Sequence, residues 1–240
     1  MQPQIPTFLE IIFVVLTFVL FALIVAAVKS VRQKMGDDNL KSRKYALRVG
    51  AVLLIWLAVT RQLSSLHFLD NWSALPPHFL VLIVPPVAGI LLLAFSKNFS
   101  KFLLHVPAHW LINIQSFRIV MELILWGLFL NDIIGKQMTF EGRNFDVLVG
   151  ISALILAVAV KRGKLKSKFW LYAWNVAGLI LLLNIVIVAI LSTPLPFRVF
   201  TDGPPNSMIA YFPFVWLPSF VVPVAFAMHV FSIRKTVLSA

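Results

Sequence analysis

The sequence predicts an all-α, polytopic membrane bundle with seven transmembrane helices, the N-terminus outside and the C-terminus in the cytoplasm. Three observations predict it: an apolar composition, apolar runs long enough to cross a bilayer, and basic residues confined to alternate connections. Hydrophobic residues make up 60% of the chain and charged residues 12%, against roughly 45–50% and 25% in soluble domains. The mean hydropathy of +0.92 therefore indicates that lipid is the solvent for most of the surface.

The length predicts a single transmembrane domain over residues 1–240, with no separate soluble domain. A helix rises about 1.5 Å per residue and needs about 20 residues to cross the hydrocarbon core. A chain of 240 residues therefore has room for seven spans and short connections. Cysteine is absent, which excludes disulfides, thiolate metal sites and thiol nucleophiles.

Apolar runs place the spans at about 7–28, 46–66, 78–96, 104–130, 146–160, 169–192 and 208–232. The fifth run is short, so a six-span interpretation stays open unless that span begins within Asn144–Asp146. The first span has no basic segment before it and contains Glu10. We therefore interpret it as a retained anchor and not as a signal peptide.

The distribution of basic residues predicts the orientation. Most of the 21 lysines and arginines fall in alternate connections, which the positive-inside rule assigns to the cytoplasm. This predicts a multi-pass protein of the cell membrane, the inner membrane if the source is bacterial. The net charge of +12 then reflects topology, and we expect no nucleic-acid partner. The basic residues on this side are Lys29, Arg32, Lys34, Lys41, Arg43, Lys44, Arg48, Lys97, Lys101, Lys161, Arg162, Lys164, Lys166, Lys168, Arg234 and Lys235.

Spans one to three and five to seven have the same predicted orientation, which allows a 3+1+3 parallel repeat around span four. Short similarities occur in the right order, such as Ala22–Lys29 with Leu154–Lys161 and Pro86–Ala88 with Pro223–Ala225. Chance similarity among Leu, Val, Ala and Ile residues is the alternative explanation.

This plan resembles that of SWEET-type sugar carriers and of microbial rhodopsins. The chain departs from both in its motifs. Its sole Pro-Gln pair, Pro3-Gln4, lies in the N-terminal tail, and every lysine lies in a connection or at the end of a span. A retinal Schiff base is therefore not expected.

Prolines interrupt spans three and seven. Pro85 and Pro86 fall near the middle of span three, and Pro213, Pro218 and Pro223 divide span seven. Each proline removes an amide donor and frees a carbonyl that protein or water must satisfy. Broken helices are typical of binding sites and hinges in transporters, which makes Pro85, Pro86, Pro218 and Pro223 candidate gating residues. Packing kinks are the alternative.

Span four carries polar residues on two faces, and neither face suits lipid. Gln115, Arg118 and Glu122 fall within about 60° of one another at about 100° per residue. Arg118 and Glu122 are spaced to form an i, i+4 ion pair. Charges inside a membrane usually face the bundle interior or a water-filled cavity.

Other polar residues lie at a similar depth. Glu10 and Arg61 could pair near the outer ends of the first two spans. Together with Gln62, Asn144 and Asp146, they predict a polar cavity that opens outward. A guanidinium there would suit a carboxylate or phosphate group. Structural ion pairs are the alternative. The candidate substrate-binding residues are Arg118, Glu122, Gln115, Arg61, Glu10, Asn144 and Asp146.

Three histidines form a candidate metal site at the cytoplasmic side. His105 and His109 are four residues apart, and His229 lies at the matching depth of span seven. Three histidines with an open fourth position could bind zinc and activate water. No carboxylate lies at that depth to act as a general base, so histidines satisfied by headgroups or water are the simpler interpretation. We expect no catalytic residue and no cofactor, with zinc as the alternative.

The outer loop Asn131–Asp146 contains the polar run Glu141–Asp146 and could cap the mouth of the cavity, although a plain turn explains it as well. The favoured function is a transporter or channel for a small anionic or polar solute. A metal-dependent membrane enzyme and a sensor or assembly subunit are the alternatives. The sequence identifies neither the solute nor the oligomeric state.

Overall fold

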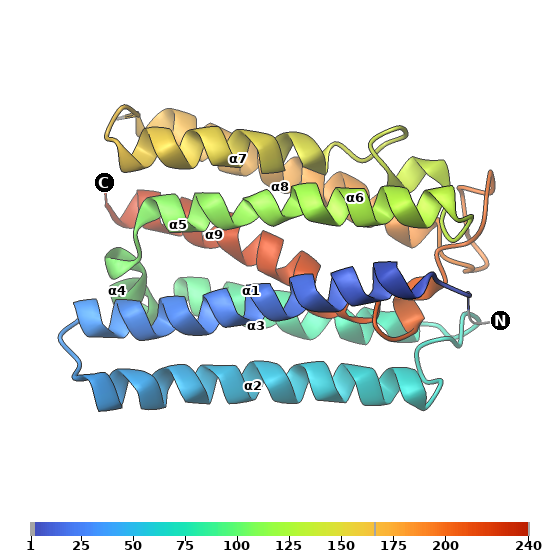
Figure 1. Cartoon of the computed structure of the whole chain (residues 1–240), viewed down its shortest axis with the longest axis horizontal. Helices are drawn as coiled ribbons and strands as arrows, with labels where there is room; N and C mark the ends of the chain where they lie inside the picture. Colours follow the sequence, from blue (N-terminus) through green and yellow to red (C-terminus); the bar gives the residue numbers. More distant parts are fainter. Residues whose placement is uncertain (1–2, 166, 240) are drawn as a thin grey trace.

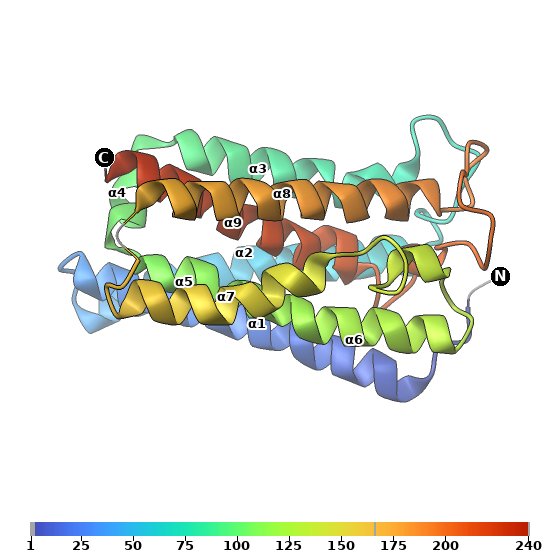
Figure 2. The same ribbon diagram turned by 90° about the horizontal axis from the view of Figure 1, so that it is seen from above.

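The computed structural model describes residues 3–165 and 167–239, and within these residues the chain is helical with no strand. Lys166, one of the basic residues used to orient the chain, lies outside the described residues. The long helices run side by side along one axis, and the short helix α4 lies across them at one end (Figures 1 and 2).

The helices follow most of the predicted spans. In chain order they are α1 Thr7–Lys34, α2 Asn39–Ser65, the 3-10 segment η1 His78–Leu82, α3 Val84–Phe95, α4 Lys97–His105, α5 Ala108–Asn113, η2 Ile114–Ser116, α6 Phe117–Leu130, η3 Lys136–Met138, α7 Asp146–Lys161, α8 Lys168–Leu191, η4 Met208–Ala210, the π-helical η5 Leu217–Val221 and α9 Val222–Leu238.

Six helical stretches of the described residues are long and apolar enough to cross a membrane. They are α1, α2, η1 with α3, α5 with α6, α8, and η5 with α9. The fold is therefore compatible with a multi-pass integral membrane protein whose apolar helices contact lipid. Helix α7 has 16 residues and is shorter than these six, as its short apolar run suggested.

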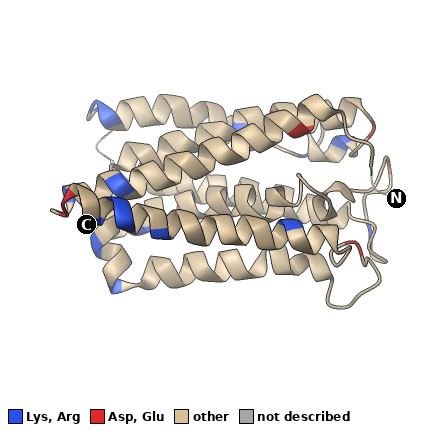
Figure 3. Cartoon of the chain, turned by 60° about the horizontal axis from the view of Figure 1, so that its bottom comes forward, with Lys and Arg blue, Asp and Glu red and all other residues tan. Residues whose placement is uncertain are grey.

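The connections alternate between the two ends of the bundle. The start of the described chain and the connections after α2, α6 and α8 lie at one end, which we call the N-terminal end (Figure 1). The connections after α1, α3 and α7 and the C-terminal end of α9 lie at the other. Most lysines and arginines gather at this second end (Figure 3), which we call the basic end.

Three predicted spans are not continuous helices. In span three, the 3-10 segment η1 precedes α3. In span four, α4 ends at His105 and a new helix starts after Pro107, and η2 interrupts that helix again before α6. In span seven, residues 208–216 form η4 and turns, and helix begins only at Leu217. Prolines explain the break between α4 and α5 and the irregular start of span seven, because Pro107, Pro213 and Pro218 cannot donate the amide hydrogen bonds that a continuous helix needs.

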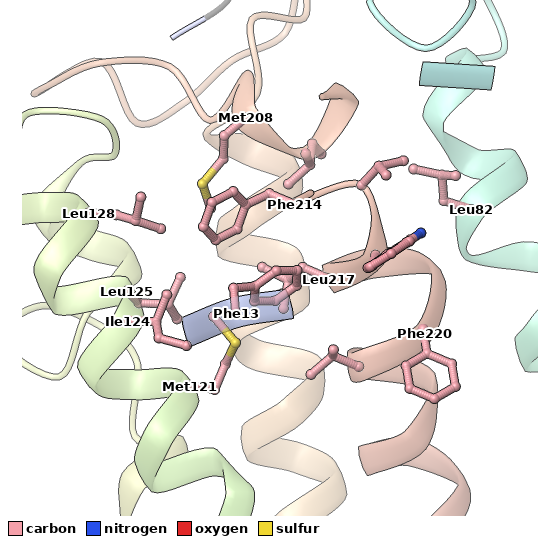
Figure 4. Close-up of a cluster of buried hydrophobic side chains, with 14 of the residues drawn as sticks. Phe13, Leu82, Met121, Ile124, Leu125, Leu128, Met208, Phe214, Leu217 and Phe220 are labelled. Carbon is pink, nitrogen blue, oxygen red and sulfur yellow. The ribbon is translucent and has the colours of Figure 1, made fainter. Parts of the chain in front are cut away.

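The hydrophobic core lies where the segment before η5 enters the bundle (Figure 4). The rings of Phe13 and Phe214 stack with centroids 4.6 Å apart, and both side chains are completely buried. Met121 and Leu125 of α6 and Leu217 of η5 belong to the same cluster. Most of the apolar residues 208–216 are therefore buried in the bundle, although they form no helix beyond the short η4 and Phe212 is exposed.

A tryptophan side chain supplies a hydrogen bond that the proline at the start of α9 cannot donate. Pro223 has no amide hydrogen to donate to the carbonyl of Ser219, four residues earlier. Trp56 of α2 donates its indole N–H to this carbonyl at 2.8 Å. Trp216 donates in the opposite direction, to the carbonyl of Leu57, at 3.0 Å. These two hydrogen bonds join α2 to η5.

We predict that Trp56→Phe lowers the free energy of unfolding in detergent by about 1–3 kcal/mol, because a carbonyl inside the bundle loses its donor while most of the ring remains. Trp170→Phe is the matched control, since Trp170 is 62% exposed and should tolerate the change. Thermal unfolding of the two variants, followed by circular dichroism, measures the difference. Equal midpoints would contradict the role given to Trp56.

Candidate functional site

Arg118 lies in the first turn of α6 and is almost completely buried. Its side chain is 2% exposed, and Nη1 lies 3.5 Å from Oδ1 of Asp146, the first residue of α7. Its Nε and Nη2 atoms have no hydrogen-bond partner among the described residues. A buried donor left unsatisfied costs about 1–3 kcal/mol, and more in a charged group. These two nitrogens therefore require an acceptor beyond those of the described residues.

Glu122 lies one turn further along α6 but is not paired with Arg118. Its Oε1 accepts the backbone N–H of Phe140 at 2.6 Å, and its Oε2 accepts the side-chain amide of Asn144. The predicted i, i+4 ion pair is therefore wrong. The connection after α6 folds back onto the bundle and binds the Glu122 carboxylate, while α7 supplies Asp146 to Arg118.

The connection between α6 and α7 is a compact, hydrogen-bonded cap. Asn144 is buried, and its side-chain oxygen accepts the backbone N–H of Asp146 at 3.1 Å. Gly142 lies directly against a neighbouring backbone carbonyl with no room for a Cβ atom, which only glycine allows. Gln137 donates to the Ser192 hydroxyl at 3.0 Å, which fastens the cap to the end of α8. The cap therefore holds Asn144 and the start of α7 in place.

A close helix contact sets the distance between Arg118 and Asp146. Gly150, one turn after Asp146 on α7, faces α6, and a Cβ atom at this position would lie 3.0 Å from the backbone nitrogen of Ile119. Real Cβ atoms rarely come this close to a backbone atom. The absence of a side chain at Gly150 therefore lets the two helices approach closely enough for the ion pair.

A cavity of about 90 Å³ lies beside Arg118. Apolar side chains of α6, α8, η5 and α9 make up most of its wall, so the site is less polar than the sequence suggested. Pro218 of η5 is part of this wall. The charged and amide residues that line the cavity are Arg118, Glu122, Asn144, Asp146 and Asn206.

Three predicted substrate-binding residues do not line this cavity. Gln115 is buried but donates its side-chain amide to the carbonyl of Ala225 at 3.0 Å. Arg61 is exposed, and its guanidinium lies 4.9 Å from the centre of the Phe212 ring. Glu10 is half-buried on α1, and no ion pair joins it to Arg61 in the described part of the chain. The cation–π contact with the ring takes the place of the expected pair.

The predicted gating prolines lie on both sides of one helix. Pro218 lies within η5 and faces the Arg118 cavity. Pro85 and Pro86 lie in the first turn of α3 and Pro223 in the first turn of α9. These three line a larger hollow on the other side of η5 and α9. All four therefore lie at or next to a change from irregular or π-helical backbone to α-helix, while Pro85 and Pro86 lie at the start of α3 and not within a longer helix.

The three histidines of the candidate metal site do not come together. His105 ends α4 and contacts the Lys101 carbonyl at 2.9 Å, whereas His109 lies on α5, beyond the break at Pro107. His229 is buried against α8, where its Nδ1 lies 3.0 Å from Oδ1 of Asn175. Nowhere in residues 3–165 and 167–239 do three or more metal-binding side chains form a group that could hold an ion. The predicted zinc site is therefore not formed.

Two groups of the site carry no recognisable signal in the sequence. Phe140 contributes only its backbone N–H, which any non-proline residue offers. Asn206 lies in the irregular segment after α8, and its buried Oδ1 has no hydrogen-bond partner among the described residues. Only the folded chain places these two groups near Glu122 and the cavity.

Residues 75–237 match the family model described as Domain of unknown function (DUF8737). The matched segment extends from the start of η1 almost to the end of α9 and includes every residue that lines the Arg118 cavity. No curated protein and no solved structure matches the chain. Because the matched segment covers more than half of the sequence, the chain belongs to the DUF8737 family.

Proposed function

We propose that the chain crosses the cell membrane seven times, with its N-terminal end outside and its C-terminal end in the cytoplasm. The alternation of the connections and the gathering of basic residues at one end support this orientation (Figures 1 and 3). Helix α7 has 16 residues and spans about 24 Å at 1.5 Å per residue. The folded cap covers its outer end and makes up the remaining depth of a hydrocarbon core of about 30 Å.

A parallel relation between α1–α3 and α7–α9 is part of this proposal. The two sets of helices run in the same order and directions (Figure 1), as a 3+1+3 repeat requires. The short sequence similarities of Ala22–Lys29 with Leu154–Lys161 are its other support.

The absence of cysteine from the sequence makes single introduced cysteines clean reporters of topology. We predict that a membrane-impermeant maleimide labels Ser73→Cys and Asp202→Cys in intact cells. Arg162→Cys should react only after permeabilisation, because the seven-span arrangement places it in the cytoplasm. All three residues are exposed. Labelling of Arg162→Cys from outside, at the rate of Ser73→Cys, would show that α7 does not cross the membrane.

We further propose that the protein is a transporter or channel for a small solute that binds in the Arg118 cavity. The observation that carries this proposal is that two nitrogens of the buried guanidinium, Nε and Nη2, have no hydrogen-bond partner among the described residues. Such donors suit the oxygen atoms of a carboxylate or phosphate, or of a neutral polar solute. A cavity of about 90 Å³ is well below the roughly 300–1,000 Å³ of sites for drug-sized ligands, so the solute is small.

The broken helix beside the cavity offers a means of gating. Pro218 and Leu217 of η5 line the cavity, and a π-helical turn next to two prolines lacks part of the regular hydrogen-bond ladder that stiffens a helix. Movement of η5 would open or close the cavity without unfolding α9. In this proposal, Pro85 and Pro86 act as a hinge in span three and Pro223 acts as a hinge in span seven.

We predict that Arg118→Gln abolishes the binding and flux of small oxyanions. Acetate, formate and phosphate serve as probes, each tested for a thermal shift of purified protein and for uptake into proteoliposomes. Arg61→Gln is the matched control, because Arg61 is an exposed arginine outside the cavity. Arg118→Lys keeps the charge but loses the planar set of guanidinium donors. We expect this variant to fold more stably than Arg118→Gln and still to bind and transport the oxyanions poorly.

Two outcomes would contradict the proposal. One is uptake by folded Arg118→Gln at the rate of the unchanged protein. The other is the absence of both thermal shift and uptake for all three probes and for a neutral polar solute such as glycerol.

A further inference from the structure

A second hollow, which we call the groove, lies between α2 and α3 on the side of η5–α9 that faces away from Arg118. Its volume is about 1,620 Å³, which exceeds the roughly 300–1,000 Å³ of sites for drug-sized ligands. Helices α1, α2, α3 and α9 form its long walls, and α4 and α5 close it toward the basic end. Apolar side chains make up most of the lining.

The groove is continuous with the lipid-facing surface of the bundle. Val52 and Ile55 of α2 line it and are 66% and 63% exposed, and Leu93 of α3 on the opposite wall is 47% exposed. Helix α2 is held to the bundle through α1 and η5, so its other side stands open. A molecule in the bilayer therefore reaches the groove sideways.

The groove is long enough to extend through one whole leaflet. On α2 its lining runs from Tyr45 to Val59, a length of about 21 Å at 1.5 Å per residue. One leaflet contributes about half of a hydrocarbon core of roughly 30 Å. The wall therefore extends from the basic end to beyond the middle of the bilayer, which matches an acyl chain that starts at a headgroup near Tyr45.

The polar lining of the groove gathers at its basic end, apart from Asn113 and Ser219 further in. Arg32 has a buried Nε atom with no partner among the described residues, and its guanidinium lies 4.4 Å from the centre of the Tyr45 ring. Lys101 of α4 is exposed at the same end. The other polar residues there are Ser30, Ser96 and Asn98.

Two acidic residues lie at this end, Asp37 beside Arg32 and the exposed Asp38 at the start of α2, and the basic residues there outnumber them. Asp37 forms ion pairs with both Arg32 and Lys41. The hydrogen bond from Lys41, together with the nearby Arg32 charge, lowers the pKa of Asp37 although partial desolvation opposes the shift. The three residues therefore carry a net positive charge at neutral pH, and Lys101 adds another.

We infer that the groove binds one anionic phospholipid from the leaflet at the basic end, with its phosphate between Arg32 and Lys101 and an acyl chain along α2 and α3. Basic pockets between transmembrane helices are suited to anionic headgroups. An apolar helix from another protein would fill the groove but would leave the buried Nε of Arg32 without an acceptor. Charge complementarity therefore favours the phospholipid. This inference does not depend on the solute proposed for the Arg118 cavity.

Gly89 provides a way to block the groove without disturbing the fold. It lines the groove on α3, and a Cβ atom at this position would meet no atom within 4 Å. Gly89→Phe should therefore fit into the groove and exclude an acyl chain. Ile155→Phe is the matched control, because Ile155 is 70% exposed on α7 and does not line the groove.

The test is native mass spectrometry of the detergent-purified chain with phosphatidylglycerol or phosphatidylcholine carrying the same acyl chains. We expect a single phosphatidylglycerol adduct that survives activation better than the phosphatidylcholine adduct. Arg32→Gln and Lys101→Gln should each weaken phosphatidylglycerol binding roughly fivefold, because one basic residue near an anionic headgroup contributes about 1 kcal/mol. Arg162→Gln, at the same end but outside the groove, and Ile155→Phe should leave it unchanged.

Three results would overturn the inference. Equal retention of the two lipids would remove the headgroup site, and an unchanged adduct in Gly89→Phe would place the lipid elsewhere. A dimer of the chain that Gly89→Phe disrupts would show that a second copy occupies the groove. Lys101→Gln and Gly89→Phe keep the test decisive if Arg32→Gln fails to fold.

Discussion

Arg118 is a charged residue enclosed in an apolar bundle. The packing of α6 against α7 places a carboxylate beside this charge. Asp146 reaches it because Gly150 lets α7 approach α6 closely. The chain between these helices then has to fold back, and Glu122 fixes it by accepting the Phe140 N–H and the Asn144 amide. The contact between α6 and α7 therefore depends on one buried guanidinium, whose loss would leave the buried Asp146 carboxylate without its counter-charge.

The broken helix formed by η5 and α9 divides the interior into two compartments. Leu217 and Pro218 face the cavity at Arg118, while Phe220 and Pro223 face the groove. The hydrogen bonds made by Trp56 and Trp216 join η5 to α2, on the side of the broken helix that faces the groove. A lipid in the groove and a solute in the cavity would thus contact opposite faces of the same proline-rich turn.

The length of the apolar runs and the positions of the charges made the helices predictable. The hydrogen bonds and ion pairs of the site could not be predicted, because they join residues that are far apart in the sequence. The predicted span 169–192 agrees with α8, and 146–160 agrees with α7, because apolar runs bounded by charges leave few alternatives. Local spacing gave Arg118 the wrong partner, since an i, i+4 rule cannot anticipate a carboxylate 28 residues away. Residues 211–215 are mostly apolar and buried but form no regular helix, because Pro213 interrupts the backbone hydrogen bonds of a helix.

A double-mutant cycle between Arg118 and Asp146, measured as free energy of unfolding in detergent, tests this account most directly. With Arg118→Met and Asp146→Leu, we expect each single change to cost about 3–5 kcal/mol, because it leaves a buried charge unpaired. The double variant should lose clearly less than the sum, with a coupling energy above about 1 kcal/mol. Additive losses would contradict the account and show that the two residues stabilise the bundle independently.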